Sequence, residues 1–161
     1  MKRLQAEFER WFADVTKREY ARVPIEIGRA DENPVEIDLT WGEPTGVVKP
    51  QYRDYNSDTI DNWVSTDDSV AWKVDVVASG EYELVLEYGC QPSDAGAIAR
   101  LTLGKAVLDH TFIATPGRMV WATQRVGTMQ LTKGVTELRM KPVKILGAEL
   151  AAIHKIWIRK L

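Results

Sequence analysis

The opening segment of the chain has the apolar spacing of an amphipathic α-helix. Apolar residues recur at i, i+4, i+7, i+8 and i+11, and they are Leu4, Phe8, Trp11, Phe12 and Val15. Charged residues largely fill the opposite face, and Pro24 ends any continuation of the helix. Because three aromatic rings lie on the apolar stripe, we expect this helix to need a partner surface that covers them.

After Pro24 the apolar period shortens to that of β-strands. Short strands are predicted at 25–28 and 35–39, separated by a turn at 30–34. Residues 40–62 are rich in Gly, Pro, Asp, Asn and Tyr, and we interpret them as a long irregular loop.

From Trp63 onward the pattern is typical of β-structure. Residues 70–76 and 82–88 alternate apolar with polar positions on either side of Ser79-Gly80, which predicts a β-hairpin. Further apolar runs, separated by Gly and Pro, lie at 97–103, 106–113, 118–126, 128–132, 135–140 and 148–159. Many short strands at this spacing indicate an antiparallel sandwich or barrel rather than alternating strands and helices.

Composition and charge narrow the possible partners. The 161 residues have a formal net charge of −2 and no block of Lys and Arg, so neither nucleic acid nor an anionic membrane is expected as a partner. No stretch has the length of a membrane-spanning helix, and residues 1–10 lack the apolar core of a signal peptide. The single cysteine, Cys90, excludes an internal disulfide.

The chain shows no complete catalytic constellation. Residues 90–93 (CQPS) resemble the start of the sulfatase nucleophile motif, Cys-x-Pro-Ser-Arg, but Asp94 stands in place of the Arg and would repel a sulfate ester. We therefore interpret the match as coincidental. Two histidines, His110 and His154, cannot complete a closed zinc site, and His154 is expected on a half-buried strand face. The chain is accordingly not expected to be an enzyme on its own.

Two kinds of loop residue remain as candidates for binding. The acidic residues Asp58, Asp61, Asp67 and Asp68 either form a calcium site or bond the backbone of their own turns. Aromatic residues lie in or beside the long loop and after the Pro116-Gly117 turn, and they are Trp41, Tyr52, Tyr55, Trp63 and Trp121. Such rings either stack on the apolar face of a sugar or plug the ends of a sandwich.

Residues 4–40 resemble the segment that follows the catalytic core in bacterial arylsulfatase-type sulfatases. The resemblance rests on residues 9–15 (ERWFADV), 22–28 (RVPIEIG) and 32–35 (ENPV). It implies that the chain is the C-terminal accessory region of a sulfatase-like enzyme. It also implies a sulfatase catalytic domain as partner and a periplasmic or extracellular location.

The remainder of the chain resembles family 6 and family 35 carbohydrate-binding modules over residues 63–161. The matching stretches are 68–76 (DSVAWKVDV), 79–84 (SGEYEL), 115–121 (TPGRMVW), 131–134 (LTKG) and the final strand at 153–161. This resemblance implies a galactose-binding-like jelly-roll β-sandwich, with Trp121 and Tyr88 at stacking positions. Those modules commonly have Asn and Asp before the last strand, whereas this chain has ELAAI at 149–153.

Taken together, the patterns and the resemblances predict a mostly β protein with one N-terminal helix. Residues 1–40 would link to the catalytic core, and residues 41–161 would form a non-catalytic carbohydrate-binding sandwich. The residues expected to contact sugar are Trp121, Trp63, Tyr52, Tyr55 and Tyr88 by stacking, and Asp67, Asp94 and Arg118 through hydroxyl or sulfate groups. The alternatives are a domain that only docks on its catalytic partner through the 4–15 stripe and, last, a sulfuric ester hydrolase. No cofactor is expected apart from calcium at the acidic cluster.

Overall fold

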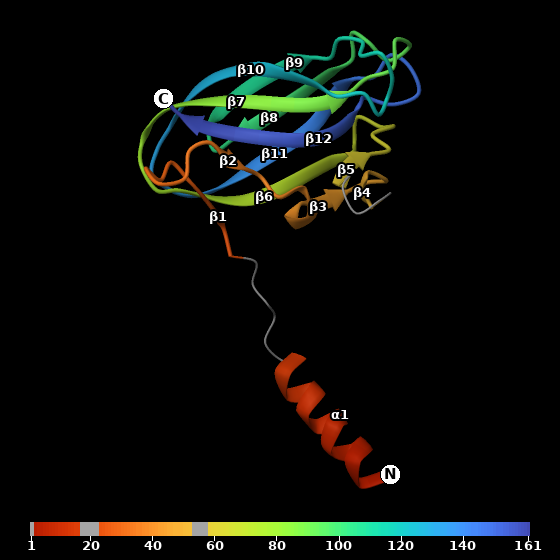
Figure 1. Ribbon diagram of the computed structural model, residues 1–161, viewed down its shortest axis with the longest axis vertical. Helices are drawn as coiled ribbons and strands as arrows, with labels where there is room; N and C mark the ends of the chain where they lie inside the picture. The colour runs from red at the N-terminus through yellow and green to blue at the C-terminus, as the bar shows by residue number, and fades with distance from the viewer. Residues whose placement is uncertain (1, 17–22, 53–57) are drawn as a thin grey trace.

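A computed structural model describes residues 2–16, 23–52 and 58–161, with side chains described at 4–14, 23–48 and 59–161. Figure 1 shows a β-sandwich and one α-helix, α1 (Lys2–Thr16), which stands apart from it. The helix predicted from the apolar spacing is confirmed, and every side chain described on it is exposed. Within the described ranges, no helix is long and apolar enough to cross a membrane.

The sandwich has two six-stranded sheets. The first has the order β1-β6-β11-β8-β9, with β3 also on β6, and the second has the order β10-β7-β12-β5-β4, with β2 also on β12. Their bounds are β1 (Ile25–Ile27), β2 (Val35–Glu36), β3 (Glu43–Thr45), β4 (Lys49–Tyr52), β5 (Asp58–Asp61), β6 (Ser69–Val76), β7 (Gly80–Gly89), β8 (Ile98–Leu103), β9 (Ala106–Thr111), β10 (Ala122–Leu131), β11 (Gly134–Lys144) and β12 (Ala152–Lys160). Among these strands only β1 and β6 pair in parallel. The predicted antiparallel jelly-roll sandwich is therefore confirmed.

The predicted hairpin between 70–76 and 82–88 is wrong. Strand β6 pairs with β1, β3 and β11, whereas β7 pairs with β10 and β12 in the other sheet. The chain changes sheet between Val76 and Gly80, where the Tyr82 hydroxyl donates a hydrogen bond to the Ala78 carbonyl oxygen at 2.5 Å. Both strands have an apolar row, and placing them in opposite sheets lets both rows face one shared interior. Trp72 and Leu84, one from each row, are almost completely buried.

The long loop predicted at 40–62 is also wrong, because it contains a short 3-10 helix, η1 (Leu39–Trp41), and strands β3, β4 and β5. Two of these strands contain prolines, Pro44 in β3 and Pro50 in β4. Strand β4 lies at the edge of its sheet, and β3 pairs only with β6. Proline is tolerated at sheet edges because its missing N–H removes no hydrogen bond there. The Pro and Asp content that indicated a loop is therefore compatible with short edge strands.

Three predicted boundaries shift in the structure. The runs 118–126 and 128–132 form one strand, β10, with an irregularity in its pairing between Arg125 and Gly127. The run at 35–39 is a strand only at β2, and Leu39 begins η1. The sandwich also begins at Ile25 rather than at residue 41, since β1 pairs with β6 and β2 pairs with β12.

The core lies between the two sheets. Its largest fully buried side chains come from both layers and include Trp63, Trp72, Tyr82, Tyr88 and Phe112. A single continuous cluster of this size excludes water from the interior and supplies the main driving force for folding. Loop residues such as Trp63 and Phe112 belong to this core together with strand residues, so the core also holds the loops at the strand ends in place.

Candidate functional site

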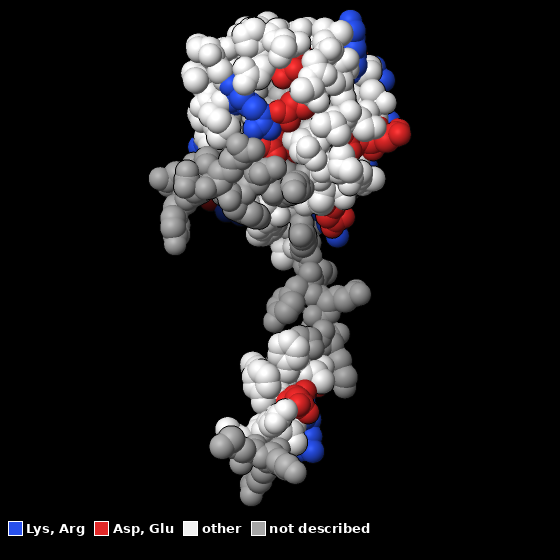
Figure 2. All heavy atoms as spheres, turned by 90° about the vertical axis from the view of Figure 1, so that its right-hand side faces the viewer, with Lys and Arg blue, Asp and Glu red and all other residues white. Residues whose placement is uncertain are grey.

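Loops gather at the end of the sandwich where β7 terminates, on the right of Figure 1, and this end faces the reader in Figure 2. The segment at 112–121, between β9 and β10, is tied to the end of β7. The Thr115 backbone N–H donates to the Cys90 carbonyl oxygen at 2.9 Å, and the Cys90 N–H donates to Thr115 Oγ1 at 3.0 Å. A Cβ at Gly89 would lie 1.9 Å from the Arg118 carbonyl oxygen, so only glycine permits this close approach.

Arg118 lies at the centre of an ion-pair cluster that joins three segments. Its Nη2 donates to Asp61 Oδ2 at 2.7 Å and to Glu149 Oε2 at 3.0 Å, and its Nε also donates to Glu149 Oε1. Glu149 therefore holds one edge of the guanidinium with both carboxylate oxygens, which is the favoured geometry of such pairs. Asp61 ends β5, and Glu149 lies in the loop between β11 and β12. Figure 2 shows basic and acidic side chains side by side on this end of the sandwich.

This cluster, which we call the Arg118 cluster, is partly accessible to solvent. The Arg118 side chain is 20% exposed and that of Glu149 is 14% exposed, whereas Asp61 is fully buried. The hydrogen bonds that Arg118 donates to Glu149 raise its pKa above the ordinary value, with the bond to Asp61 adding to this and burial opposing it. Arg118 is therefore charged at any physiological pH.

Trp121 lies three residues after Arg118 and forms a second group of contacts. Its ring is half-buried and stacks on the His154 ring, with the centroids 4.4 Å apart and an interplanar angle of 10°. His154 Nδ1 is 2.6 Å from Glu87 Oε1, and the Thr123 hydroxyl donates to the other oxygen of Glu87 at 3.0 Å. His154 is half-buried on β12, as the alternation of apolar residues around it predicted. Since His154 covers one face of the indole, a ligand would have to use the remaining exposed part.

Two of the expected stacking residues are not available to a ligand. Trp63 is fully buried, and its Nε1 donates to the Ile60 carbonyl oxygen at 3.0 Å. Tyr88 is also fully buried, and its ring packs edge-on against Phe112. The expected contacts of Trp63 and Tyr88 with sugar are therefore wrong, because both rings were drawn into the core by their apolar area. Tyr55 and the side chain of Tyr52 lie outside the described residues.

The three polar residues that were expected to contact sugar differ in how far they are exposed to solvent. Asp94 is 3% exposed, and its Oδ1 accepts a hydrogen bond from the Ala148 N–H at 2.9 Å, so it ties two loops together and does not face a ligand. Asp67 is exposed on the surface. Arg118 is half-buried in the segment 112–121, which also holds Trp121.

Two of the acidic residues considered for calcium, Asp61 and Asp68, have other partners. Asp68 is buried and accepts backbone hydrogen bonds from Val47, Val64 and Ser65 at 2.8 to 2.9 Å. Asp61 pairs with Arg118. No group of three or more potential metal-ligating side chains occurs in the part of the chain that the structure describes. The side chain of Asp58 lies outside that part, so calcium binding stays a prediction.

Cys90 lies in a setting unsuited to a nucleophile. It is fully buried, and burial together with nearby Asp94 and Glu149 raises the pKa of its thiol to about 11. The thiolate, which is the reactive form, is therefore suppressed at neutral pH. This agrees with the interpretation of the residue 90–93 motif as coincidental.

Sequence reasoning missed the partners of Arg118 and Trp121. Asp61 entered only as a calcium candidate, Glu149 only as a departure from a module pattern, and His154 only as a structural histidine. Arg118 is 57 positions from Asp61 and 31 from Glu149, so no local spacing connects them. Only the ELAAI departure before the last strand marked the Glu149 loop as unusual.

Comparisons with known proteins identify the fold. No protein-family model matches the chain, and no curated protein matches it. Among solved structures, a family 35 carbohydrate-binding module from Clostridium thermocellum has a TM-score of 0.62 and 16% identity, and the match covers 80% of this chain and 98% of the module. The chain has the fold of a family 35 carbohydrate-binding module.

Two larger enzymes contain a similar domain. The Podospora anserina GH26-CBM35 β-(1,4)-mannanase has a TM-score of 0.64 and 14% identity, covering 81% of this chain and 28% of the mannanase. An exo-β-1,3-galactanase from Phanerochaete chrysosporium has a TM-score of 0.63 and 12% identity, covering 78% of this chain and 29% of the galactanase. This chain therefore spans the length of the isolated module but less than a third of either enzyme.

Proposed function

We propose that this chain is a non-catalytic carbohydrate-binding domain whose site is the loop end that carries Arg118 and Trp121. The observation that supports it most is the placement of a half-buried indole and a partly exposed guanidinium in the same segment, 112–121, on this fold. A pyranose ring presents an apolar face that stacks on indole, while its hydroxyls bond to charged and polar groups at the rim.

The available surfaces suit a sugar of modest size. The exposed part of Trp121 supplies apolar contact on one side only, since His154 covers the opposite side of the ring. Arg118 Nη1 makes no hydrogen bond with the described residues, so it can donate to a hydroxyl. Glu149 can accept from another hydroxyl through its exposed part. Weak binding of a chain end or a short stretch of glycan is expected.

Binding is tested on the whole chain with mannan, β-1,3-galactan and dextran in affinity gel electrophoresis, followed by titration calorimetry with the polysaccharide that retards it. Trp121→Ala should weaken binding at least about tenfold, because the stacking area is lost. Trp157→Ala is the matched control, since Trp157 is also half-buried but lies on β12, with its Nε1 bonded to Glu36 at 3.0 Å. The absence of retardation and heat with every polysaccharide, or equal losses in both variants, would refute the proposal.

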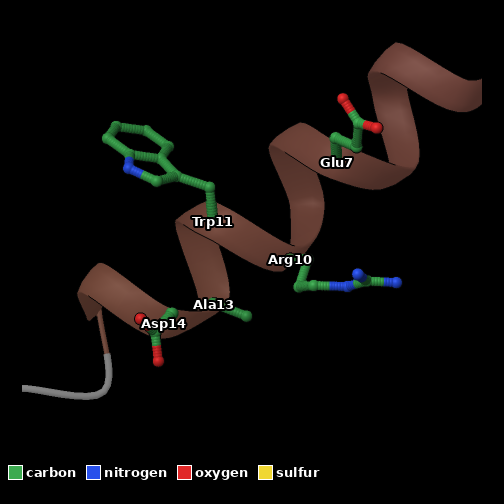
Figure 3. Close-up of a pocket in the computed structure, with 5 residues that line it drawn as sticks. All are labelled: Glu7, Arg10, Trp11, Ala13 and Asp14. Atoms are coloured by element: carbon green, nitrogen blue, oxygen red, sulfur yellow. The ribbon is translucent and has the colours of Figure 1, made fainter.

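A second function is favoured by a separate observation on α1. Leu4, Phe8, Trp11 and Phe12 are 77%, 59%, 59% and 53% exposed, which is unusual for a set of neighbouring apolar side chains. The surface depression beside Trp11 encloses about 430 Å³, but all five residues that line it belong to α1 (Figure 3). It is therefore the open flank of a helix rather than a small-molecule cavity.

We infer that α1 docks on the catalytic domain of a larger enzyme, for which the resemblance of residues 4–40 implies a sulfatase. The stripe of α1 would fill an apolar groove on that domain, as amphipathic helices do. Size-exclusion chromatography with a separately purified arylsulfatase catalytic domain tests this. Trp11→Ala should abolish co-elution, whereas Glu9→Ala on the polar face should not, and the absence of co-elution with the unaltered chain would count against docking.

A further inference from the structure

His154 occupies an irregular position in strand β12. The pairing of β12 with β7 shifts register between Ile153 and Lys155, so His154 is an extra residue with no Cα partner on β7. A strictly alternating strand would place Ile153 and Ile156 on opposite faces, yet both are fully buried. A β-bulge of this kind redirects the side chains around it. It lets the apolar residues on either side fill the core while His154 and Lys155 stay half-buried.

The imidazole of His154 is held by a chain of hydrogen bonds across three neighbouring strands. Glu87 lies on β7, between Thr123 on β10 and His154 on β12 (Figure 1). One oxygen of its carboxylate is 2.6 Å from His154 Nδ1, and the other accepts from the Thr123 hydroxyl at 3.0 Å. The side chains of His154 and Glu87 are only 14% and 20% exposed, and partial shielding from water strengthens such bonds. The plane of the imidazole is therefore fixed.

This fixed ring supports an indole that belongs to a loop. Trp121 precedes β10, which begins at Ala122, so the sheet does not hold its backbone. The edge of its ring lies over Gly89, where a Cβ would be 3.2 Å from Trp121 Cζ3. Its face lies against His154, with the centroids 4.4 Å apart and the planes within 10° of parallel. Without the imidazole, the indole could turn into the space that His154 fills.

We propose that His154 is a positioning residue of the loop-end site, which holds the Trp121 indole in the orientation on which a sugar ring stacks. The inference rests on the carbohydrate-binding function proposed above. His154 covers the side of the indole opposite to the one that the sugar would use, so it acts through Trp121 rather than by contact with sugar. Holding the ring in place before binding removes the entropic cost of ordering it when the sugar arrives.

The binding test uses calorimetric titration of the whole chain with mannan, β-1,3-galactan or dextran, whichever it binds. His154→Gln keeps a polar side chain but removes the ring, and it should weaken binding about threefold to tenfold. His154→Phe keeps a flat ring without its polar atoms, and it should bind within about twofold of the unaltered chain. Trp157→Ala, on the same strand, is the control and should leave binding unchanged. Tighter binding by the Gln variant than by the Phe variant would mean direct contact of His154 with sugar and would overturn the proposal.

Mobility of the indole gives a second measurement that needs no sugar. The indole N–H resonance of Trp121 is identified by its absence in Trp121→Phe, and its ¹⁵N relaxation gives an order parameter. This should be near the rigid value of about 0.85 in the unaltered chain and in His154→Phe, and below about 0.6 in His154→Gln. Glu87→Leu, which removes the acceptor for His154 Nδ1, should also lower it.

The outcomes separate the two proposals. An indole as rigid in both His154→Gln and Glu87→Leu as in the unaltered chain would overturn the positioning role. So would glycan binding that His154→Gln leaves unchanged, and in either case the carbohydrate-binding function would stand. Failure of every polysaccharide to bind the unaltered chain would instead refute that function, and with it the role of His154 in binding.

Discussion

Helix α1 and the strands of the sandwich both carry periodic apolar rows, with the period of a helix in one and of β-strands in the other, but only the rows of the sandwich are covered within the described structure. Trp63 is fully buried within the sandwich, whereas Trp11 on α1 is 59% exposed. The difference shows that a periodic apolar pattern identifies a face that needs covering but does not say whether the chain itself covers it. For α1, covering by another protein is the interpretation that we propose.

The largest expected effect is on the sandwich core. Trp63→Ala should lower the free energy of unfolding by about 3 to 5 kcal/mol, because it removes a fully buried ring and leaves a cavity. Urea denaturation followed by circular dichroism measures this, and Trp63→Phe should lose less. A loss below about 1 kcal/mol for Trp63→Ala would mean that this ring is not packed as described.

A smaller effect is expected where the sandwich uses a buried charge to hold a loop. Asp68→Ala should cost about 2 to 3 kcal/mol, since its carboxylate accepts three backbone N–H bonds that would be left unsatisfied. The exposed neighbour offers a control, because Asp67→Ala should change stability by no more than about 0.5 kcal/mol. Equal effects at the two positions would contradict a structural role for the Asp68 carboxylate.

The buried histidine should give the sandwich a pH dependence. Burial lowers the pKa of His110. The centroid of its ring lies 4.9 Å from that of the Phe112 ring, and its Nε2 has no hydrogen-bond partner within the described structure. Below about pH 6.5 the unfolded chain therefore binds a proton that the folded chain does not, and stability falls as the pH drops. The urea concentration at the midpoint of unfolding, measured at a series of pH values from 7.5 downward, should show this decline. His110→Leu should flatten it, and an unchanged slope would exclude His110 as the titrating group.

The smallest expected effect is on α1. Trp11→Ala should leave the unfolding free energy of the sandwich unchanged within about 0.5 kcal/mol, because the ring is exposed and lies on a helix apart from the core. The same urea transitions measure it. A loss above about 1 kcal/mol would show that α1 packs on the sandwich in solution and would remove the contrast between the two regions.

Much of the secondary structure could be predicted because it depends on neighbours in the sequence. The helix at α1 and the strands near 98–103, 106–111 and 135–140 follow from apolar periods that a few residues define. The prediction failed where the local signal was compatible with two structures. Ser79-Gly80 suits a hairpin turn as well as a crossover between sheets, and the prolines of β3 and β4 suit loops as well as edge strands.

The candidate site was less predictable than the fold. Arg118 and Trp121 were named from sequence, but their meaning depends on Asp61, Glu149 and His154, which arrive from other strands and loops. From the sequence, Arg118 was expected to contact hydroxyl or sulfate groups. Its ion pairs with Asp61 and Glu149 could not be seen without knowing which carboxylates the fold brings to it.

The sequence by itself determined where the helix and most strands form and which of their faces are apolar, because these properties depend on side chains within a few residues of one another. Only the tertiary structure decided which sheet each strand joins, which tryptophans are buried and which charges meet at the loop end. Those outcomes depend on segments separated by tens of residues, whose contacts form only when all the apolar rows share one interior. Trp63 and Trp121 seemed equivalent in the sequence, but Trp63 is buried in the core whereas Trp121 is half-buried at the loop end.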